Sequence, residues 1–253
     1  MLNRRQFLQC SAALSLSSLA WAVPPLRLAY FETYSPLSFR GEAGMQGILV
    51  ELFDELLGKR LGQTLVHQGY PWVRAQSLVQ HGEQDAMCTV ATPERLSYAR
   101  AAQESVLDMP IRVFVRADSP RLAELQAVQN LAQLRALDPE VLSYVGNGWA
   151  KEKLAGMRVD WGGTFADSLR KLKAGRGEVM VENALTMQYT LKQLDPERRV
   201  LMLNNDLERS RFQLLISLRS PHLGLLPAFD EALRRYKREP GYAQLFERYG
   251  IRL

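Results

Sequence analysis

The sequence of 253 residues is poor in the side chains that build metal centres, disulfide frameworks and catalytic triads. It has two cysteines, Cys10 and Cys88, and three well-separated histidines: His67, His81 and His222. This cysteine count gives no disulfide framework, and isolated histidines have neither metal-ligand nor triad spacing. We therefore expect no metal and no cofactor. Cys88 follows apolar residues in a short strand pattern, which predicts a buried, unreactive thiol.

The chain also lacks long hydrophobic runs and a strong charge of one sign. Beyond the N-terminal segment there is no stretch of about 18 apolar residues, so no membrane span is expected in the mature protein. The formal net charge is +5, and removing Arg4 and Arg5 leaves 30 basic against 27 acidic residues, or +3. The basic residues are scattered, which argues against nucleic acid or anionic lipid as a partner.

The N-terminal residues 1–22 have the three parts of a secretory signal. Arg4 and Arg5 form the positive end, residues 7–19 form the apolar stretch, and Ala20-Trp21-Ala22 is a small-x-small cleavage site. The protein is therefore predicted to be periplasmic, and soluble after cleavage near Ala22.

The leader leaves its export route open. Residues 3–9 resemble the twin-arginine export motif, but ordinary secretory leaders also carry paired arginines. Cys10 is not expected to be a lipoprotein anchor, because no small residue stands directly before it and almost no apolar stretch precedes it.

The mature chain predicts two successive α/β units. Within residues 26–90, strands alternate with helices, a pattern typical of parallel pairing in an α/β unit. The predicted strands are 26–30, 64–66 and 86–90, the predicted helices are 48–57 and 72–79, and residues 31–39 are predicted as a loop. Residues 111–115 form a β-branched strand that takes the chain out of the first unit.

A second α/β set follows, and the chain then returns. The predicted strands are 141–145, 179–181 and 212–218. One predicted helix begins near residue 150, and the others cover residues 165–172, 183–194, 228–237 and 242–249. We therefore predict an α/β fold of two lobes. Residues 23–113 plus 215–253 are assigned to lobe 1 and residues 114–214 to lobe 2, with hinge strands at its ends.

Several stretches, in order, resemble the extracellular solute-binding proteins of family 3, the amino-acid-binding type with the type II periplasmic fold. They are residues 45–52 (MQGILVEL), 70–75 (YPWVRA), 82–86 with 92–95 (GEQDA and TPER), 175–179 (GRGEV) and 242–250. The resemblance implies two lobes of mostly parallel sheet flanked by helices, joined by crossing strands, with a ligand trapped between them.

Arg95 is the strongest candidate for contact with that ligand. It follows Thr92-Pro93, just past the carboxyl end of a predicted strand, where open α/β sheets place their ligand crevice. A guanidinium can hold a carboxylate with two parallel hydrogen bonds, and by resemblance this arginine holds the ligand carboxylate. The alternative is a surface arginine paired with Glu94 or Asp85.

Three aromatic residues are further candidates by resemblance. Tyr34 and Tyr70 match positions where the family stacks rings on its ligand, and Trp72 lies close to them in the sequence. Aromatic walls desolvate a small ligand, and their hydroxyl groups orient it. For Trp72, packing in the core is an equal alternative.

Other candidate positions depart from the family pattern. Gly148 opens a helix whose free N–H groups suit an anion, but Trp149 follows where relatives often have threonine. Val90 replaces a usual hydroxyl, and Asn183 replaces the usual aspartate for the ligand ammonium. Glu182 is adjacent, and strand alternation predicts that it points the other way. These departures weaken the case for an amino group, so the sequence predicts a carboxylate-bearing ligand and leaves its amino group open.

The predicted function is capture of a small polar ligand, an amino acid or related compound, for an ABC-type uptake system. The expected partners are that ligand and a membrane permease or receptor, and the protein is expected to be a monomer. Two alternatives remain. One is a dehydratase-like enzyme on this fold, in which Glu182 or Glu32 acts as the acid, and the other is a ligand sensor for a membrane receptor.

Overall fold

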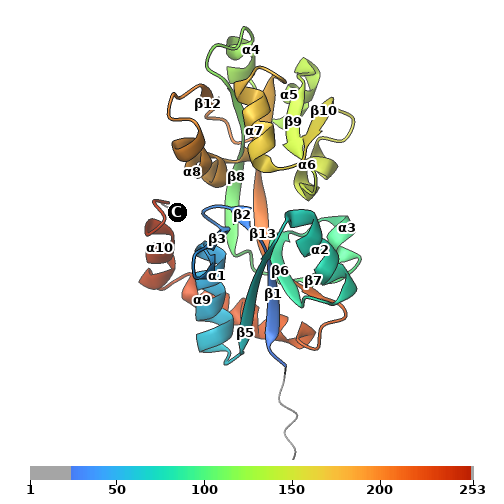
Figure 1. Ribbon diagram of the computed structural model, residues 1–253, viewed down its shortest axis with the longest axis vertical. Helices are drawn as coiled ribbons and strands as arrows, with labels where there is room; N and C mark the ends of the chain where they lie inside the picture. The colour runs from blue at the N-terminus through green and yellow to red at the C-terminus, as the bar shows by residue number, and fades with distance from the viewer. Residues whose placement is uncertain (1–23, 252–253) are drawn as a thin grey trace, which may run out of the picture.

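The computed structural model describes residues 24–251 and folds them into two lobes stacked along the long axis of the molecule (Figure 1). Two ten-residue strands, β8 (Leu107–Arg116) and β13 (Glu208–Ser217), run between the lobes. The predicted leader, residues 1–22, lies outside the described residues. Of the helices in the described part, none has the length and hydropathy needed to cross a bilayer.

Lobe 1 contains the first described residues and the last. Its strands in the main sheet are β1 (Leu26–Phe31), β5 (Leu65–Tyr70), β6 (Ala86–Val90) and β7 (Ala99–Ala101). Its helices are α1 (Ile48–Phe53) continuing as the π-helix η1 (Asp54–Arg60), α2 (Trp72–His81), α3 (Pro93–Leu96), the 3-10 turn η2 (Leu223–Leu225), α9 (Leu226–Tyr236) and α10 (Pro240–Glu247). A small antiparallel sheet joins β2 (Thr33–Tyr34), β3 (Ser38–Gly41) and β4 (Gly44–Gln46).

Lobe 2 is formed by the middle of the chain. Its strands are β9 (Val141–Tyr144), β10 (Val159–Gly162), β11 (Val179–Asn183) and β12 (Val200–Met202). Its helices are α4 (Leu122–Gln126), α5 (Leu131–Leu137), α6 (Gly148–Lys153), α7 (Phe165–Lys173) and α8 (Ala184–Leu194).

One continuous sheet connects the lobes, in the order β10-β9-β11-β8-β13-β6-β1-β5. The outer strands of each half are parallel: β1 pairs with β5 and β6, and β9 pairs with β10 and β11. The two long strands are antiparallel to these and to each other, with Leu107–Ile111 paired to Glu208–Phe212. The prediction of two α/β lobes joined by crossing strands is therefore confirmed.

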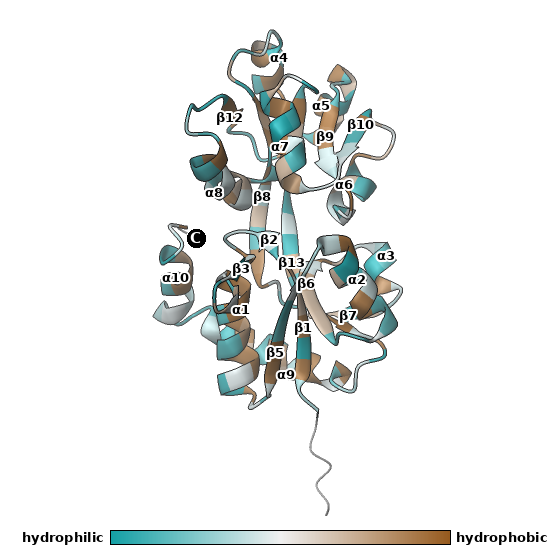
Figure 2. Cartoon of the chain, viewed as in Figure 1, coloured by the Kyte–Doolittle hydropathy of each residue, from teal (hydrophilic) through white to brown (hydrophobic). Residues whose placement is uncertain are grey.

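Each lobe has its own apolar interior. In lobe 1, the strands pack against α1, η1, α9 and α10 through fully buried side chains that include Leu28, Phe53, Phe229 and Phe246. In lobe 2, buried residues of β8, β9 and β11 pack against the surrounding helices. In contrast to these two apolar cores, the part of β13 that lies between the lobes is hydrophilic (Figure 2). Two separate cores joined by a polar strand are suited to lobes that move relative to each other.

Most differences between the structure and the sequence prediction concern short elements. The predicted loop over residues 31–39 is wrong in part, because β2 and the start of β3 lie within it. The prediction also missed α4, α5, β7, β10 and β12, and it placed the start of β13 four residues late. Elements of three to seven residues are too short for a hydrophobic repeat to stand out.

Candidate ligand-binding cleft

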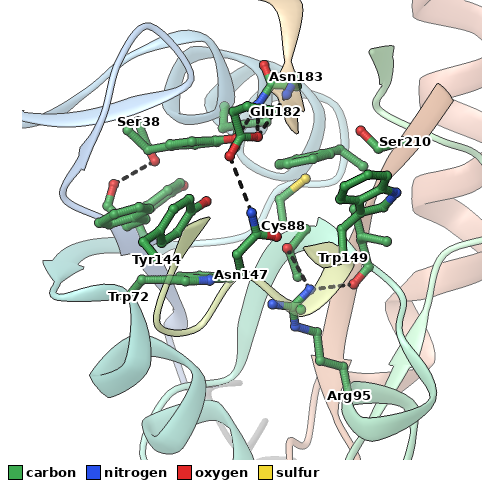
Figure 3. A pocket seen from close by; sticks show the side chains of 18 of the residues that line it. Ser38, Trp72, Cys88, Arg95, Tyr144, Asn147, Trp149, Glu182, Asn183 and Ser210 are labelled. Atoms are coloured by element: carbon green, nitrogen blue, oxygen red, sulfur yellow. Dashed lines mark hydrogen bonds between the residues drawn. The ribbon is translucent and has the colours of Figure 1, made fainter. Parts of the chain in front are cut away.

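A cleft lies where the carboxyl ends of the parallel strands of the two lobes face each other, beside the crossing strands. It encloses a cavity of about 50 Å³, which is room for a few water molecules. Its aromatic lining residues are Tyr30, Phe31, Tyr34, Trp72, Tyr144, Trp149 and Phe212. Its polar lining residues are Ser38, Thr89, Arg95, Asn147, Glu182, Asn183 and Ser210 (Figure 3).

Local structure brings Arg95 into this cleft. Strand β6 ends at Val90, and Thr92 then caps α3 by accepting the backbone N–H of Arg95 at 3.4 Å from Oγ1. Pro93 occupies the first turn, where its missing N–H leaves no backbone bond unmade. The short helix therefore begins at the strand end and turns the arginine inward, where only 3% of its surface is exposed.

The guanidinium of Arg95 donates hydrogen bonds only to neutral acceptors. Nε and Nη2 donate to Oε1 of Gln76 at 3.1 and 3.0 Å, and Nη1 donates to Thr89 Oγ1 and to the Val90 carbonyl at 3.2 and 2.9 Å. Nη2 also reaches across the cleft to the carbonyl of Gly146 in lobe 2 at 3.2 Å. All five N–H groups are thus engaged, but the positive charge has no negative partner.

The carboxylates that could neutralise Arg95 are paired elsewhere. Asp85 binds Arg27 at 2.9 Å, and Glu94 binds Lys151 of lobe 2 at 2.7 Å. Among residues 24–251, none provides a salt bridge to Arg95, and burial lowers the pKa of its guanidinium. The alternative of a surface arginine paired with Asp85 or Glu94 is therefore wrong. A buried cation that no carboxylate neutralises is unfavourable by itself, which makes Arg95 a candidate for contact with an anionic ligand.

Glu182 provides a buried carboxyl on the opposite wall. Its Oε1 accepts the backbone N–H of Asn183 at 2.8 Å, the side-chain Nδ2 of Asn183 at 3.1 Å and the hydroxyl of Tyr34 at 3.5 Å. Its Oε2 accepts Nδ2 of Asn147 at 3.3 Å. Burial raises the pKa of Glu182 to about 7, and the hydrogen bonds from Asn183 and Tyr34 oppose the shift.

The predicted direction of Glu182 is wrong, because both it and Asn183 line the cavity. Strand alternation fails here because β11 ends at Asn183, which caps α8 by accepting the N–H of Thr186 at 2.8 Å. The chain turns at this point, and the Glu182 carboxyl folds back onto the N–H of its neighbour. The Asn183 side chain is occupied by the helix cap, Glu182 and Tyr34.

Aromatic rings form a row along the cleft. Trp72 stacks on Phe31 at 5.9 Å between ring centroids, Phe31 stacks on Tyr34 at 5.4 Å, and Tyr34 stacks on Phe212 at 6.5 Å. Tyr144 of lobe 2 closes the row against Phe31 at 6.2 Å. The row gives the cleft an apolar wall next to its charged groups, which strengthens electrostatic contacts by excluding water.

The remaining predicted site residues are divided between the cleft and the lobe 1 surface. Val90, Gly148 and Trp149 line the cavity. A Cβ atom on Gly148 would lie 2.8 Å from Cζ of Arg95, so the guanidinium packs directly on this glycine. Tyr70 is not among the lining residues, and its hydroxyl instead bonds to Gln68 at 3.2 Å.

Ser210 is a cleft residue that the sequence reasoning missed. It lies on β13 between the lobes and is 4% exposed, and its hydroxyl has no hydrogen-bond partner among the described residues. A buried hydroxyl is unfavourable unless it has a hydrogen-bond partner. No sequence signal identifies it, because its role follows from the crossing of β8 and β13.

Contacts across the cleft hold the lobes together. The carbonyl of Gly146 accepts the indole N–H of Trp72 at 2.9 Å as well as Arg95, and Lys151 pairs with Glu94 at the rim. Gly146 has a φ of 92° at the turn after β9, and a Cβ there would lie 3.0 Å from Trp72. Glycine thus permits both the turn and the close approach of the lobes.

The residues described provide no metal centre in this cleft or elsewhere. Within residues 24–251, no group of three or more histidine, cysteine, aspartate or glutamate side chains is placed to hold a metal ion. Cys88 is buried, and burial raises the pKa of its thiol. The chemistry of the cleft is therefore that of one guanidinium, one carboxyl, hydroxyl and amide groups, and aromatic rings.

Solved structures with the same fold include amino-acid-binding proteins and a sensor domain. A histidine kinase sensor domain with similarity to periplasmic binding proteins matches with a TM-score of 0.76 and 20% identity, covering 90% of this chain and 97% of its own. The substrate-binding protein of an amino acid ABC transporter matches with a TM-score of 0.70 and 16% identity, covering 89% and 99%. An ancestral amino-acid-binding protein, a precursor of cyclohexadienyl dehydratase, matches with a TM-score of 0.69 and 21% identity, covering 89% and 94%.

These identities show a common fold, and the family follows from the sequence itself. No curated protein matches the chain. The family model of the bacterial extracellular solute-binding proteins, family 3, matches residues 26–251, which is nearly all of the described chain. Together with the two lobes and the cleft between them, this match supports a ligand-binding role. The protein belongs to the bacterial extracellular solute-binding proteins, family 3.

Proposed function

We propose that this protein captures a small, polar, carboxylate-bearing ligand between its lobes and delivers it to an ABC-type uptake system. The observation that carries the proposal is the Arg95 guanidinium, which is 3% exposed and has no salt-bridge partner among the described residues. An isolated buried charge is unfavourable, and a ligand carboxylate would neutralise it. The ligand class is that of amino acids and related compounds.

Capture requires the lobes to separate and close again. The cavity of about 50 Å³ is too small for most polar metabolites, so a ligand enters when the contacts to Gly146 break. Its carboxylate then replaces neutral acceptors of Arg95, such as Gly146 or Gln76. Charge-assisted hydrogen bonds are about twice as strong as neutral ones, so this exchange favours the ligand-bound, closed state.

Other lining residues would complete the recognition. The ring row from Trp72 to Phe212 supplies apolar contact, and the Ser210 hydroxyl supplies a hydrogen bond that nothing else in the described chain takes up. Of the remaining sequence candidates, Val90, Gly148, Trp149 and Asn183 shape the cavity wall. Tyr70 has no such position and is left out of the proposed site.

A thermal-shift screen of the protein without residues 1–22 tests this proposal. The probes are the common amino acids, dicarboxylates and polyamines, because a ligand that binds the folded state raises the Tm. We expect carboxylate-bearing compounds to raise the Tm of the wild type and to have little effect on Arg95→Ala. Hits confined to compounds without a carboxylate would contradict the proposal.

The proposed partner is a membrane protein, and two classes fit the fold. A permease is the partner expected for the family, whereas the sensor domain of a histidine kinase has the same architecture at a TM-score of 0.76. Ligand-dependent binding to a permease supports transport, and ligand-dependent contact with a receptor supports sensing. Both require the periplasmic location that the leader predicts.

Glu182 favours one candidate function of another class, which is acid-catalysed elimination of water from a carboxylic acid. Its pKa of about 7 and its place in the cleft would let it protonate a leaving hydroxyl group. Mass spectrometry of each screening hit after incubation tests this. A product 18 mass units lighter that forms with the wild type but not with Glu182→Gln would establish the enzyme, and an unchanged compound supports binding alone.

A further inference from the structure

One backbone carbonyl of lobe 2 is held by three donors of lobe 1. The carbonyl oxygen of Gly146 accepts hydrogen bonds from Nε1 of Trp72 at 2.9 Å and from Nη2 of Arg95 at 3.2 Å. Nε2 of Gln76 approaches the same oxygen at 3.4 Å. A carbonyl oxygen has two lone pairs, so it cannot satisfy three donors at full strength. A carboxylate offers about four acceptor sites and would satisfy the same donors better.

The turn that carries Gly146 is shaped for this approach. It joins β9 to α6, and Figure 1 shows α6 of lobe 2 facing α2 of lobe 1. Gly146 has a φ of 92°, and a Cβ on it would lie 3.0 Å from Cδ1 of Trp72 and 3.1 Å from Cγ2 of Val73. Because the residue is glycine, the backbone of lobe 2 can enter the group of donors on lobe 1.

The Gly146 contact and a bound ligand exclude each other. With the contact in place, all N–H groups of Arg95 are engaged, and the cavity of about 50 Å³ has room for only a few water molecules. A ligand carboxylate and the Gly146 carbonyl would compete for the same Nη2 donor. The donors of lobe 1 thus have two alternative acceptors, one from lobe 2 and one from solution.

We propose that the Gly146 carbonyl acts as an internal ligand, which closes the lobes of the ligand-free protein and competes with an external carboxylate for Arg95. The competition rests on the proposed function, because that function assigns the external carboxylate to Arg95. Closure does not rest on it, since it requires only the contacts of Gly146 with lobe 1. A compound is then captured only if it binds the lobe 1 donors more strongly than the carbonyl does.

The strength of the contact is limited by the chemistry of its partners. The Gly146 carbonyl is neutral, and hydrogen bonds between a cation and a carboxylate are stronger than those to a neutral acceptor. Closure also buries the charge of Arg95 to 3% exposure without a carboxylate partner among the described residues, and this cost opposes closure. We therefore expect the closed form to exceed the open form by about tenfold, a margin that a carboxylate can overcome.

Tyr34 of lobe 1 also joins the lobes, but it leaves Arg95 untouched. Its hydroxyl bonds to Glu182 and Asn183 of lobe 2, and its ring meets Phe165 edge-on at 6.3 Å between centroids. These contacts use no donor of the guanidinium. They support closure, but they do not decide between the internal and the external acceptor.

Gly146→Ala tests the competition, because its Cβ would enter the contact with Trp72 and Val73 while the donors of lobe 1 remain. The matched control in lobe 2 is Gly156→Ala. Gly156 has a similar φ of 82°, but a Cβ there would meet only Nη1 of Arg135, at an ordinary 3.6 Å. Both variants carry the strain of an alanine at positive φ, so the difference between them reports on the contact alone.

The expected result is a gain of affinity. Gly146→Ala should bind carboxylate probes about tenfold more tightly than Gly156→Ala, because the open form no longer has to be released from the internal contact. The probes are the L-amino acids and dicarboxylates that raise the Tm of the wild type, and titration calorimetry gives their affinities. The Tm of each variant without probe shows whether it is folded.

Small-angle X-ray scattering tests closure without any probe. The protein without residues 1–22 is dialysed free of small molecules, and the curve of the wild type should match the curve calculated from this structure. Gly146→Ala should have a larger radius of gyration than Gly156→Ala. Trp72→Phe removes the 2.9 Å hydrogen bond but keeps a ring against Phe31, so it should give a smaller increase in the same direction.

The outcomes separate this inference from the proposed function. If the wild type without probe is open, or if Gly146→Ala and Gly156→Ala scatter alike, closure by Gly146 is contradicted whatever the ligand. If Gly146→Ala opens the protein but binds probes no more tightly than its control, the competition for Arg95 is contradicted. If no carboxylate probe raises the Tm of the wild type, the proposed function fails, and scattering still decides whether Gly146 closes the lobes. If Gly146→Ala does not fold, unchanged scattering by Trp72→Phe contradicts closure in its place.

Discussion

The two buried ionisable groups of the cleft, Arg95 in lobe 1 and Glu182 in lobe 2, differ in their charge near neutral pH. In lobe 1, Arg95 stays ionised because the ordinary pKa of a guanidinium is far above neutrality, and burial cannot move it far enough. In lobe 2, burial raises the pKa of Glu182 to about 7, so its charge is conditional. The charge of Arg95 is therefore permanent, whereas that of Glu182 depends on pH.

The largest effect is expected when the permanent charge is removed. Arg95→Ala should weaken binding of a carboxylate ligand by about 100-fold or more, because it deletes charge-assisted hydrogen bonds in a buried site. Arg95→Lys keeps the charge but lacks the forked geometry of a guanidinium, so its affinity should lie between those of the wild type and Arg95→Ala. Titration calorimetry measures all three proteins, and equal affinities would remove Arg95 from the site.

The conditional charge should be visible in the stability of the protein without ligand. Glu182 has a raised pKa in the folded state, so its stabilising contribution is complete below about pH 4.5 and is lost as the pH rises through about 7. The difference corresponds to about 3 kcal/mol. Urea unfolding of the wild type and of Glu182→Gln at several pH values should show the gap between them shift by this amount. A constant gap would contradict the assignment.

A larger side chain at Gly148 should lower ligand affinity by displacing the guanidinium of Arg95 without removing its charge. A Cβ on Gly148 would meet Cζ of Arg95 at 2.8 Å, so Gly148→Ala should displace the guanidinium and reduce affinity by about tenfold. The matched control is Gly224→Ala, since a Cβ at Gly224 has no atom within 4 Å. Equal affinity in the two variants would show that the position of Arg95 is not critical.

Ser210, on the crossing strand β13, should contribute less to ligand affinity than Arg95. Ser210→Ala removes a buried hydroxyl that has no partner among the described residues, so we expect no loss of stability. Affinity should fall about fivefold for a ligand that uses this hydroxyl. Unfolding and binding measured on the same variant separate these effects, and a marked loss of stability would contradict the picture of an unbonded group.

The smallest effect is expected at the rim. Lys151 and Glu94 pair across the lobes at 2.7 Å, but their side chains are 69% and 65% exposed. Lys151→Ala should therefore change affinity by less than about threefold, and added salt should reduce even that change. An effect as large as that of Gly148→Ala would mean that the rim, rather than the cleft interior, controls closure.

The sequence predicted the lobes well because each contains strands and helices with a clear hydrophobic repeat. The segments that became β1, β6, α2 and α8 were all placed within a few residues. The predicted boundaries, 113/114 and 214/215, fall inside β8 and β13. A boundary within a continuous strand carries no change of composition, so local patterns cannot fix it.

The site was harder to predict than the fold, because its residues meet only through long-range packing. Arg95 was accessible to prediction, since a proline turn directly after a strand is a local signal. Glu182 was assigned to the wrong side because alternation holds within a strand and fails at its end. Ser210 and Tyr144 give no local signal, and only the crossing of β8 with β13 and the approach of lobe 2 bring them to the cavity.

The central claim is that the lobe 1 guanidinium holds a ligand carboxylate, and a chemical pairing experiment tests it most directly. Each screening hit is titrated into the wild type and into Arg95→Ala, both as the free acid and as its primary amide. The account predicts that the wild type prefers the acid by at least about tenfold and that Arg95→Ala shows no such preference. Equal binding of acid and amide by the wild type would contradict it.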